Sequence, residues 1–379
     1  MVAVSRVVRS GRSARMIALT APSPAPESPA PGRAAVLAAL AAALGDDRGP
    51  LPVAVPQDVD AAALPAALAG AEVVVHLATP TDLAADLHLT ATQRRARAVR
   101  AVQDVAAAAD GVGARRLVVV TSTMVYGAHP DNPVPLEEGA ALRAARDDGV
   151  VGDLLEVERI VARVPRLFPR LACTVVRPAP LVGPGVDTFV TRHFETPRLL
   201  ALRGHEMVWQ FCHVDDLASA VATAVERDLD GVLTAGCLPG LPGEEVARLA
   251  GMRRTELPAA LAFRTAERLH RHGLLATPAA YLSYVVHPCV IGAERLVEAG
   301  WRPRRPAEEC VRELVAEAGA RASGAGGTDE HEAGAASGRR AERREAALGA
   351  AGAAVAIVGT AALLRQARSR RGGGRRRSP

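Results

Sequence analysis

Three hydroxyl residues follow an apolar run in the stretch VVVTSTMVYG, which extends from Val118 to Gly127. If the run is a buried strand, then Thr121, Ser122 and Thr123 stand where that strand ends. A hydroxyl there can orient the hydroxyl of a bound ligand, or it can cap the local backbone. Serine alone is a poor acid and base near neutral pH, so catalysis by Ser122 would require a partner that activates it.

The elements that would position these hydroxyls alternate along the first half of the chain. Helices are expected at 33–44, 60–69, 91–109 and 152–164, and strands at 16–20, 53–55, 72–77, 116–121, 173–177 and 231–235. Most of these strands read as continuous apolar runs, which is typical of a parallel sheet covered on both faces. The predicted fold class is α/β: a Rossmann-like doubly wound parallel sheet, a small α-rich C-terminal subdomain and a C-terminal apolar helix.

Four stretches, taken in order, resemble the extended short-chain dehydrogenase/reductase family, the NAD-dependent epimerases and dehydratases of nucleotide sugars. They are EVVVHLA, RLVVVTSTMVYG, VVRPAPLVGPG and FCHVDDLASAV, and the resemblance extends from about residue 16 to 320. It implies that a tyrosinate moves a sugar hydroxyl proton while hydride passes to or from the nicotinamide. It also implies a lysine, one helical turn after the tyrosine, and a serine or threonine that orients the substrate. By motif position, the orienting residue is Ser122.

The tyrosine and the lysine of that mechanism are absent. Counted back from Glu158, the tyrosine position falls on Val150 and the lysine position on Leu154. The chain contains no lysine, and its 3 tyrosines are Tyr126, Tyr281 and Tyr284. Nearby acids are Asp153 and Glu156, which either substitute for the lost pair or belong to a solvated helix face.

The glycine-rich phosphate loop is absent as well. In the family, glycines after the first strand let the backbone approach a pyrophosphate that sits on a helix N-terminus. Here Thr20 is followed by APSPAPESPAPG, in which proline, lacking an N–H, recurs and glycine appears only at Gly32. The resemblance therefore implies NAD or NADP as cofactor, whereas the proline-rich loop argues against tight binding of its diphosphate. The implied contacts that remain are Asp58, His76, Leu77, Ala78, Thr121 and Pro178.

Several other polar residues have both a ligand-binding and a structural interpretation. Thr123 could orient a ligand hydroxyl, and Arg177 and Arg192 could bind a diphosphate or form surface ion pairs. His213, in the run HVDDLA, could contact a substrate or belong to a turn and helix cap. We expect the arginines of residues 91–109 on an exposed helix face. We expect no metal site, because the paired histidines near residue 270 do not share a helix face.

Charge is distributed unevenly along the chain. The net charge is +5, but from residue 339 onward there are 11 arginines and 2 glutamates, which leaves about −4 for the first 338 residues. A slightly acidic body lacks the basic footprint of a nucleic-acid-binding protein. The 5 cysteines are widely spaced without a C-x-x-C pair, and the N-terminus shows no secretory signal. Both features indicate a cytoplasmic domain with reduced thiols.

The domain organisation follows from composition. We expect a disordered basic extension at 1–15, a main domain at 16–322 and a flexible linker at 323–345. A candidate transmembrane helix at 346–364 and an arginine-rich tail at 365–379 follow. The substrate subdomain is expected mainly at 178–210 and 231–322. Residues 346–364 lack charge but are rich in alanine, so a soluble or surface-lying helix is the alternative to a membrane span. The resemblance also implies a homodimer formed through the two long helices.

Two functions remain open from the sequence. The first is a catalytically degenerate relative that binds a nucleotide or nucleotide-sugar-like ligand, or acts as a membrane-associated scaffold. The second is an active enzyme that acts on a nucleotide sugar through other residues, such as Ser122 with Asp153.

Overall fold

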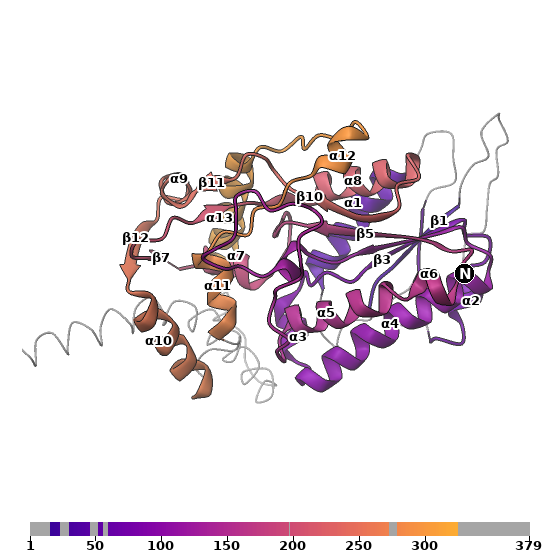
Figure 1. The fold of residues 1–379 in the computed structure, drawn as a ribbon, viewed down its shortest axis with the longest axis horizontal. Helices are drawn as coiled ribbons and strands as arrows, with labels where there is room; N and C mark the ends of the chain where they lie inside the picture. The colour runs from indigo at the N-terminus through magenta and orange to yellow at the C-terminus, as the bar shows by residue number, and fades with distance from the viewer. Residues whose placement is uncertain are drawn as a thin grey trace, which may run out of the picture.

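The computed structural model describes residues 16–22, 30–45, 52–55, 60–196, 198–272 and 279–324. Its centre is a six-stranded sheet in which every neighbouring pair is parallel, with the order β10-β5-β4-β3-β1-β2 (Figure 1). The strands are β1 (Ile17–Thr20), β2 (Val53–Ala54), β3 (Val73–Leu77), β4 (Arg116–Val120), β5 (Ala172–Pro178) and β10 (Gly231–Ala235). The order reverses between β1 and β3, so a ligand crevice is expected at the carboxyl ends of these strands. The predicted parallel α/β sheet is confirmed.

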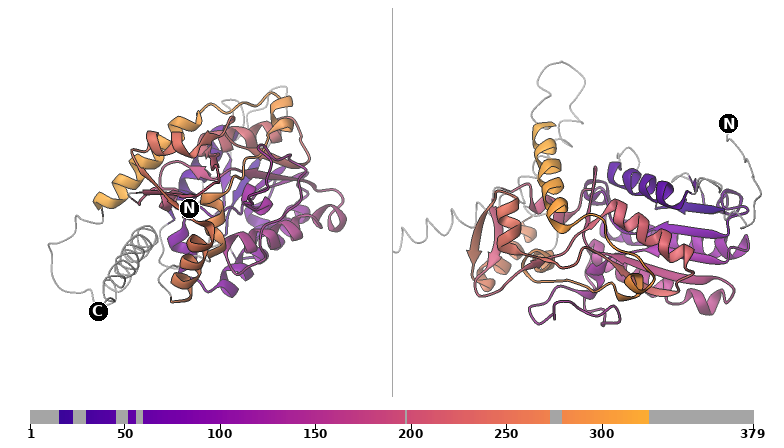
Figure 2. Two further views of the ribbon diagram at one scale, coloured as in Figure 1. Left: turned by 60° about the vertical axis from the view of Figure 1, so that its left-hand side comes forward. Right: turned by 90° about the horizontal axis from the view of Figure 1, so that it is seen from above.

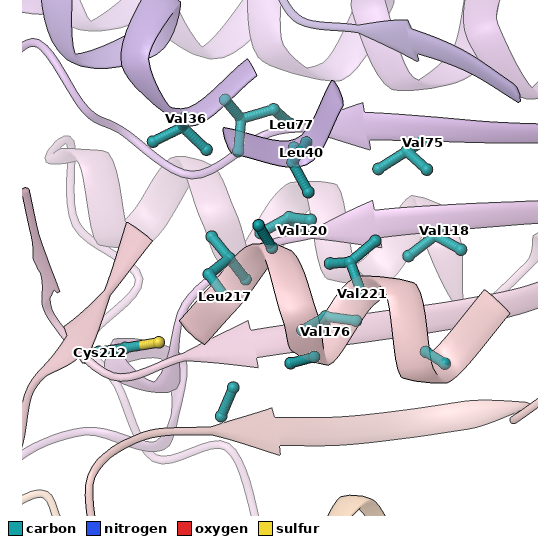
Figure 3. Packing of buried hydrophobic residues seen from close by; sticks show 14 of the residues in the cluster. Val36, Leu40, Val75, Leu77, Val118, Val120, Val176, Cys212, Leu217 and Val221 are labelled. Carbon is teal, nitrogen blue, oxygen red and sulfur yellow. The ribbon is translucent and has the colours of Figure 1, made fainter. Parts of the chain in front are cut away.

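Helices cover both faces of this sheet. On one face, α1 (Pro31–Leu44) and α8 (Val214–Glu226) pack their apolar side chains against valines and leucines of the strands, as Figure 3 shows. The other face is covered by α2 (Leu64–Ala67), α4 (Ala91–Gly111), α5 (Val150–Val161) and α6 (Val164–Leu167). Because both faces are buried, the strands carry apolar residues at successive positions.

Two short elements follow the strands at the carboxyl edge of the sheet. They are α3 (Leu83–Leu87), after β3, and the 3-10 helix η1 (Thr123–Tyr126), after β4. A small parallel pair, β6 (Leu181–Val182) with β9 (Cys212–His213), follows β5 and leads into α8. These connections decide what stands in the expected ligand crevice.

The second part of the molecule lies at one end of the sheet (Figure 2). It has its own apolar core. It is mostly helical, as predicted, and adds a parallel pair β7–β12 and an antiparallel pair β8–β11. Its elements are α7 (Phe189–His193), β7 (Arg198–Leu202), β8 (Val208–Trp209), β11 (Leu241–Pro242), α9 (Gly243–Leu249), β12 (Arg253–Leu257), α10 (Ala259–Arg271), η2 (Ala279–Leu282), α11 (Ser283–Val286) and α13 (Ala307–Gly324). Although β10 and α12 (Glu294–Glu298) fall within residues 231–322, β10 is an edge strand of the main sheet and α12 packs beside it.

Within the described ranges, no helix has the length and apolar character needed to cross a membrane. The predicted extension at 1–15, the apolar segment 346–364 and the arginine-rich tail lie outside the described residues. The predicted linker also lies outside them, apart from its first two residues, which end α13.

Candidate functional site

Ser122 is part of the turn that follows β4. Its side chain accepts a hydrogen bond from the backbone N–H of Met124 at 3.3 Å, and thereby caps η1. The neighbouring Thr121 donates its hydroxyl to Glu158 Oε1 at 2.7 Å. The Thr123 hydroxyl is buried without a hydrogen-bond partner among the described residues. Of the two interpretations of these hydroxyls, the structural one therefore accounts for Ser122 and Thr121.

Arg177, a predicted phosphate ligand, is committed to a buried network. Its guanidinium donates twice to Glu158, at 2.9 and 2.8 Å, and once to the hydroxyl of Tyr126 at 2.9 Å. The Tyr126 hydroxyl in turn donates to the backbone oxygen of Glu138 at 2.6 Å. Burial raises the pKa of Tyr126, so its phenol stays protonated near neutral pH. Arg177 therefore forms neither a surface ion pair nor an open site for a phosphate.

Val150 and Leu154 are buried in the apolar core beside this turn. Val150 packs with Met124 and Tyr281, whereas Leu154 packs with Tyr126, and the two positions are only 7% and 3% exposed. At the two positions of α5 where the resemblance implies a tyrosine and a lysine, this chain therefore has buried aliphatic side chains. The cavity that Ser122, Met124, Val150 and Phe189 help to line has a volume of about 20 Å³. That volume holds about one water molecule, so a sugar does not fit.

An aromatic group from the second part of the molecule closes this region. The Tyr281 ring stacks on Phe189 with centroids 4.7 Å apart, and its hydroxyl accepts a hydrogen bond from the Val151 N–H at 2.9 Å. The Tyr284 hydroxyl donates to the Met124 carbonyl oxygen at 2.8 Å. Burial raises the pKa of Tyr281 and of Tyr284 well above its ordinary value, so neither phenol is a substitute for the missing base. Nothing in their spacing along the chain predicts this position.

Asp153 is buried and paired, so the prediction of a solvated helix face is wrong for it. Arg94 Nε and Arg95 Nε donate to its two carboxylate oxygens at 2.6 and 2.9 Å. Arg94 is only 12% exposed, which also contradicts the expected exposed face of α4 at that position. No hydrogen bond joins Asp153 to Ser122 within the described ranges, whereas Glu156 pairs at the surface with Arg159. The combination of Ser122 with Asp153 as acid and base therefore gains no support.

The N-terminus of α1 is capped by an aspartate that lies far away in the sequence. Ala30, at the N-cap position, has no side-chain acceptor, and Pro31, after it, has no N–H. The two carboxylate oxygens of Asp82 accept hydrogen bonds from the Gly32 N–H at 2.9 Å and the Arg33 N–H at 3.0 Å. The next amide, that of Ala34, already bonds to the Ala30 carbonyl at 3.1 Å. No donor of this first turn is left for a pyrophosphate.

The segment that carries Asp82 is fixed across the crevice. It pairs with Asp187 through the Leu83 N–H to Asp187 O bond and the Asp187 N–H to Thr81 O bond, each 2.8 Å long. A Cβ atom on Gly32 would lie 2.4 Å from the Thr81 carbonyl oxygen and 2.9 Å from that of Gly185. The space above the α1 N-terminus is therefore filled by the chain itself.

A wider groove lies between α4 and the carboxyl ends of β1, β2 and β3. Its volume is about 540 Å³, which is in the range of small-molecule sites. Gln93, Arg97, Arg100 and Asp104 line it from α4, and His76 lines it from β3. His76 Nδ1 lies 2.9 Å from the hydroxyl of Thr20, while Nε2 has no hydrogen-bond partner among the described residues. Burial, aided by the charge of Arg33, lowers the pKa of His76 to about 4, so the ring is neutral.

The remaining predicted contacts have mostly structural surroundings. Arg192 donates to the Asp187 carboxylate at 2.6 and 2.7 Å. His213 caps α8, because its Nδ1 accepts the Asp215 N–H at 3.1 Å, and its Nε2 lies 3.0 Å from Glu313. Leu77, Ala78 and Pro178 lie at the ends of β3 and β5, and Asp58 lies outside the described residues.

These residues do not fit a dinucleotide bound as the resemblance implies. The α1 amides that would hold its diphosphate are bonded to Asp82, and the positions of the proton-transfer pair are Val150 and Leu154. Two pockets of ligand size adjoin the residues described above: the groove beside α4, of about 540 Å³, and one of about 370 Å³ lined in part by Glu158 and Arg177, which are bonded to each other. Within the described ranges, no cluster of three metal-ligating side chains is present.

Comparison with known proteins gives a consistent family and fold. Residues 56–234, which begin after β1 and α1, match the model of the NAD dependent epimerase/dehydratase family. An uncharacterized protein of Mycobacterium tuberculosis (strain ATCC 25618 / H37Rv) is 29% identical over 210 residues, which cover 54% of this chain and 54% of that protein. The chain therefore spans about half the length of the curated relatives that it matches.

Solved structures agree with the fold over most of the chain. UDP-glucose 4-epimerase from Thermus thermophilus, in complex with NAD, has a TM-score of 0.54 at 18% identity, covering 80% of this chain and 99% of that one. RMD from Pseudomonas aeruginosa, complexed with NADPH, has a TM-score of 0.54 at 17% identity, with coverage of 81% and 99%. At these identities the likeness shows the fold alone.

Proposed function

We propose that the chain is a catalytically degenerate member of the NAD dependent epimerase/dehydratase family, whose model matches residues 56–234. In this proposal it binds a nucleotide-type ligand but transfers no hydride. One observation carries the proposal: Val150 and Leu154 stand in the apolar core where the family's tyrosine and lysine would act. Without that pair, no group at the end of β4 moves the proton that accompanies hydride transfer.

The environment of Ser122 supports the loss of catalysis. A general acid or base must lie within hydrogen-bond reach of the atom it serves. Ser122 instead accepts a bond from the Met124 N–H, and the cavity beside it is about 20 Å³. The phenols of Tyr281 and Tyr284, which pack beside this turn, are bonded to the Val151 N–H and to the Met124 carbonyl oxygen. A substrate sugar would have to displace this packed group before any chemistry began.

The groove beside α4 supports retained binding of a nucleotide-type ligand. Its volume of about 540 Å³ suits a ligand of mononucleotide size. Arg97 and Arg100 can donate to a phosphate, while Gln93 can bond to a base or sugar. Relatives with this fold were solved with NAD and with NADPH, which makes a nucleotide the ligand class to test first.

Calorimetric titration of the full chain tests both parts of the proposal. We expect AMP to bind at one site per chain, and Arg100→Gln to weaken that binding about tenfold, as for the loss of one charge-assisted hydrogen bond. Arg163→Gln, an exposed arginine beside α6, is the matched control and should leave binding unchanged. Neither an epimer of UDP-glucose nor NADH or NADPH absorbance should develop when UDP-glucose is added with NAD or NADP, since an epimerase returns its hydride and leaves no reduced cofactor. Turnover of the cofactor would contradict the degenerate function, and lack of binding by any nucleotide would contradict the groove.

The proposal extends to the end of the chain. Residues 346–364 carry no charge and have arginines on both sides, so we propose that this segment attaches the protein to a membrane and the main domain remains cytoplasmic. Removing residues 339–379 should release the protein from the membrane fraction. Pelleting that persists through a carbonate wash would show that another part of the chain is the anchor.

Association of two chains remains an expectation of the family resemblance. The helices concerned, α4 and α5, lie side by side on one face of the sheet (Figure 1). Sedimentation of the purified chain at several concentrations would establish whether it forms the homodimer.

A further inference from the structure

The first turn of α1 is a helix N-terminus whose ligand is part of the same chain. The first-turn amides of an α-helix have no partner within the helix, and together with the helix dipole they attract anions. Here Pro31 has no N–H, and the amides of Gly32 and Arg33 each donate to one oxygen of the Asp82 carboxylate. Asp82 lies 50 residues beyond Gly32 in the sequence and is 2% exposed. Asp82 therefore binds the helix N-terminus as a separate anion would, whereas an ordinary N-cap residue directly precedes the helix in the sequence.

We propose that Asp82 is an internal anionic ligand of the α1 N-terminus, which occupies the position of a diphosphate and excludes dinucleotides from this cleft. The proposal concerns α1 and holds whether or not the groove beside α4 binds a nucleotide. It predicts that the anion site is latent: present in the backbone, but filled in the wild-type protein.

The surroundings of Asp82 hold it in that position. Thr81 donates its hydroxyl to Asp82 Oδ2 at 2.8 Å, and the backbone on either side of Asp82 pairs with Asp187. Among the described residues, the carbonyl oxygens of Thr81 and Gly185 pack closely against Gly32 and hinder the approach of a diphosphate to the amides. A bound dinucleotide would have to expel a carboxylate that already makes three hydrogen bonds, at a position where its own phosphates would make no more.

The charges nearby explain why a carboxylate is tolerated there. The Arg33 guanidinium is buried with Asp82 and Asp86 close to it, and it donates to the backbone oxygen of Pro22. Burial lowers the pKa of Arg33, and the two aspartates oppose that shift. Loss of the Asp82 charge would remove the anion that is bonded to the α1 amides and would leave Asp86 to balance the charge of Arg33. An added anion should then become a stabilising ligand.

The test is rescue of an Asp82 variant by inorganic pyrophosphate. Melting temperatures of the full chain are measured with pyrophosphate, and with sodium chloride at matched ionic strength. Asp82→Ala should melt below the wild type, and pyrophosphate should raise its melting temperature by about 2–4 °C beyond the effect of the chloride. The wild type should show no such gain. Thr81→Val is the matched control, because it weakens the same contact but leaves the carboxylate on the amides; it should melt lower without responding to pyrophosphate.

If Asp82→Ala does not fold, Asp82→Asn preserves the shape and removes the charge, and it should gain part of the response. Equal protection of the wild type and the variants by pyrophosphate would overturn the proposal, as would an absence of response in both Asp82 variants. A second measurement separates this proposal from the proposed function. In the wild type, AMP and NAD should bind with affinities within about threefold, because the second phosphate finds no donors on α1. Far tighter binding of NAD would overturn the exclusion of dinucleotides, whereas weak binding of both ligands would count against the groove alone.

Discussion

The carboxylate of Glu158 and the guanidinium of Arg177 form a buried bidentate pair, with N–O distances of 2.9 and 2.8 Å and with both side chains 7% exposed. Glu158 comes from α5 and Arg177 from β5, so the pair joins α5, which also carries Val150 and Leu154, to the sheet below it. The hydroxyls of Thr121 and Tyr126 complete its hydrogen bonds. The network therefore holds α5 against the carboxyl edge of the sheet.

Breaking this pair should be costly. Glu158→Ala leaves the Arg177 charge buried without its partner, and we expect a loss of about 3–5 kcal/mol in the free energy of unfolding. Glu156→Ala is the control on the same helix, because it removes only the surface pair with Arg159, worth about 0.5 kcal/mol or less. Urea denaturation of both variants measures the difference. Similar losses in the two variants would contradict a special role for the buried pair.

Because of Asp86, the stability of the protein should decrease as pH rises between about pH 4 and pH 6. Burial raises the pKa of Asp86 from 3.8 to about 6, although Arg33 and Arg94 oppose the shift. Between about pH 4 and pH 6 the folded protein holds this proton more tightly than the unfolded chain, so stability decreases as pH rises and levels off above pH 6. Asp86→Asn should become more stable relative to the wild type across that range, by about 1–3 kcal/mol in total. Denaturation curves at half-unit pH steps measure the difference, and a constant difference would contradict the assignment.

The contact between Gly32 and Thr81 should tolerate no added methyl group. Gly32→Ala would place a Cβ atom 2.4 Å from a backbone carbonyl oxygen, so the crossing segment would have to move, at a cost of about 1–3 kcal/mol. Gly111→Ala, at the end of α4, is the control: nothing lies within 4 Å of its added Cβ, and alanine should stabilise the helix by up to about 1 kcal/mol. If both variants were stabilised, the segment over α1 would be loose and the closed cleft would lose its support.

The hydroxyls after β4 should contribute to stability and not to turnover. Ser122→Ala removes the cap of η1 and should cost about 1 kcal/mol or less, with nucleotide binding unchanged. Thr121→Val removes a hydrogen bond to the charged Glu158 and should cost more, about 1.5–3 kcal/mol. Thermal unfolding ranks the two variants. A Ser122→Ala protein that folds normally and loses all binding would instead make Ser122 a ligand contact.

The sequence is sufficient to predict the sheet, because its determinants are local. Short, valine-rich apolar runs such as the one ending at Val120 favour buried strands, and the helical segments between them indicate crossovers in a parallel sheet. The absence of lysine and the residue types at the two expected positions are local as well: Val150 and Leu154 are identified by counting along one helix from Glu158. Residue type at those positions excludes tyrosine and lysine chemistry whatever the tertiary structure.

Only the tertiary structure decided which polar residues are still available to a ligand. Arg177 has the chemistry of a phosphate ligand, but its donors are used by Glu158, and Asp153 pairs with arginines of α4. The capping of Gly32 by Asp82 joins residues 50 apart, and no spacing rule relates an aspartate after one strand to a helix after another. The type of a residue determines which hydrogen bonds and ion pairs it can form, whereas long-range packing determines which of them are already formed within the protein.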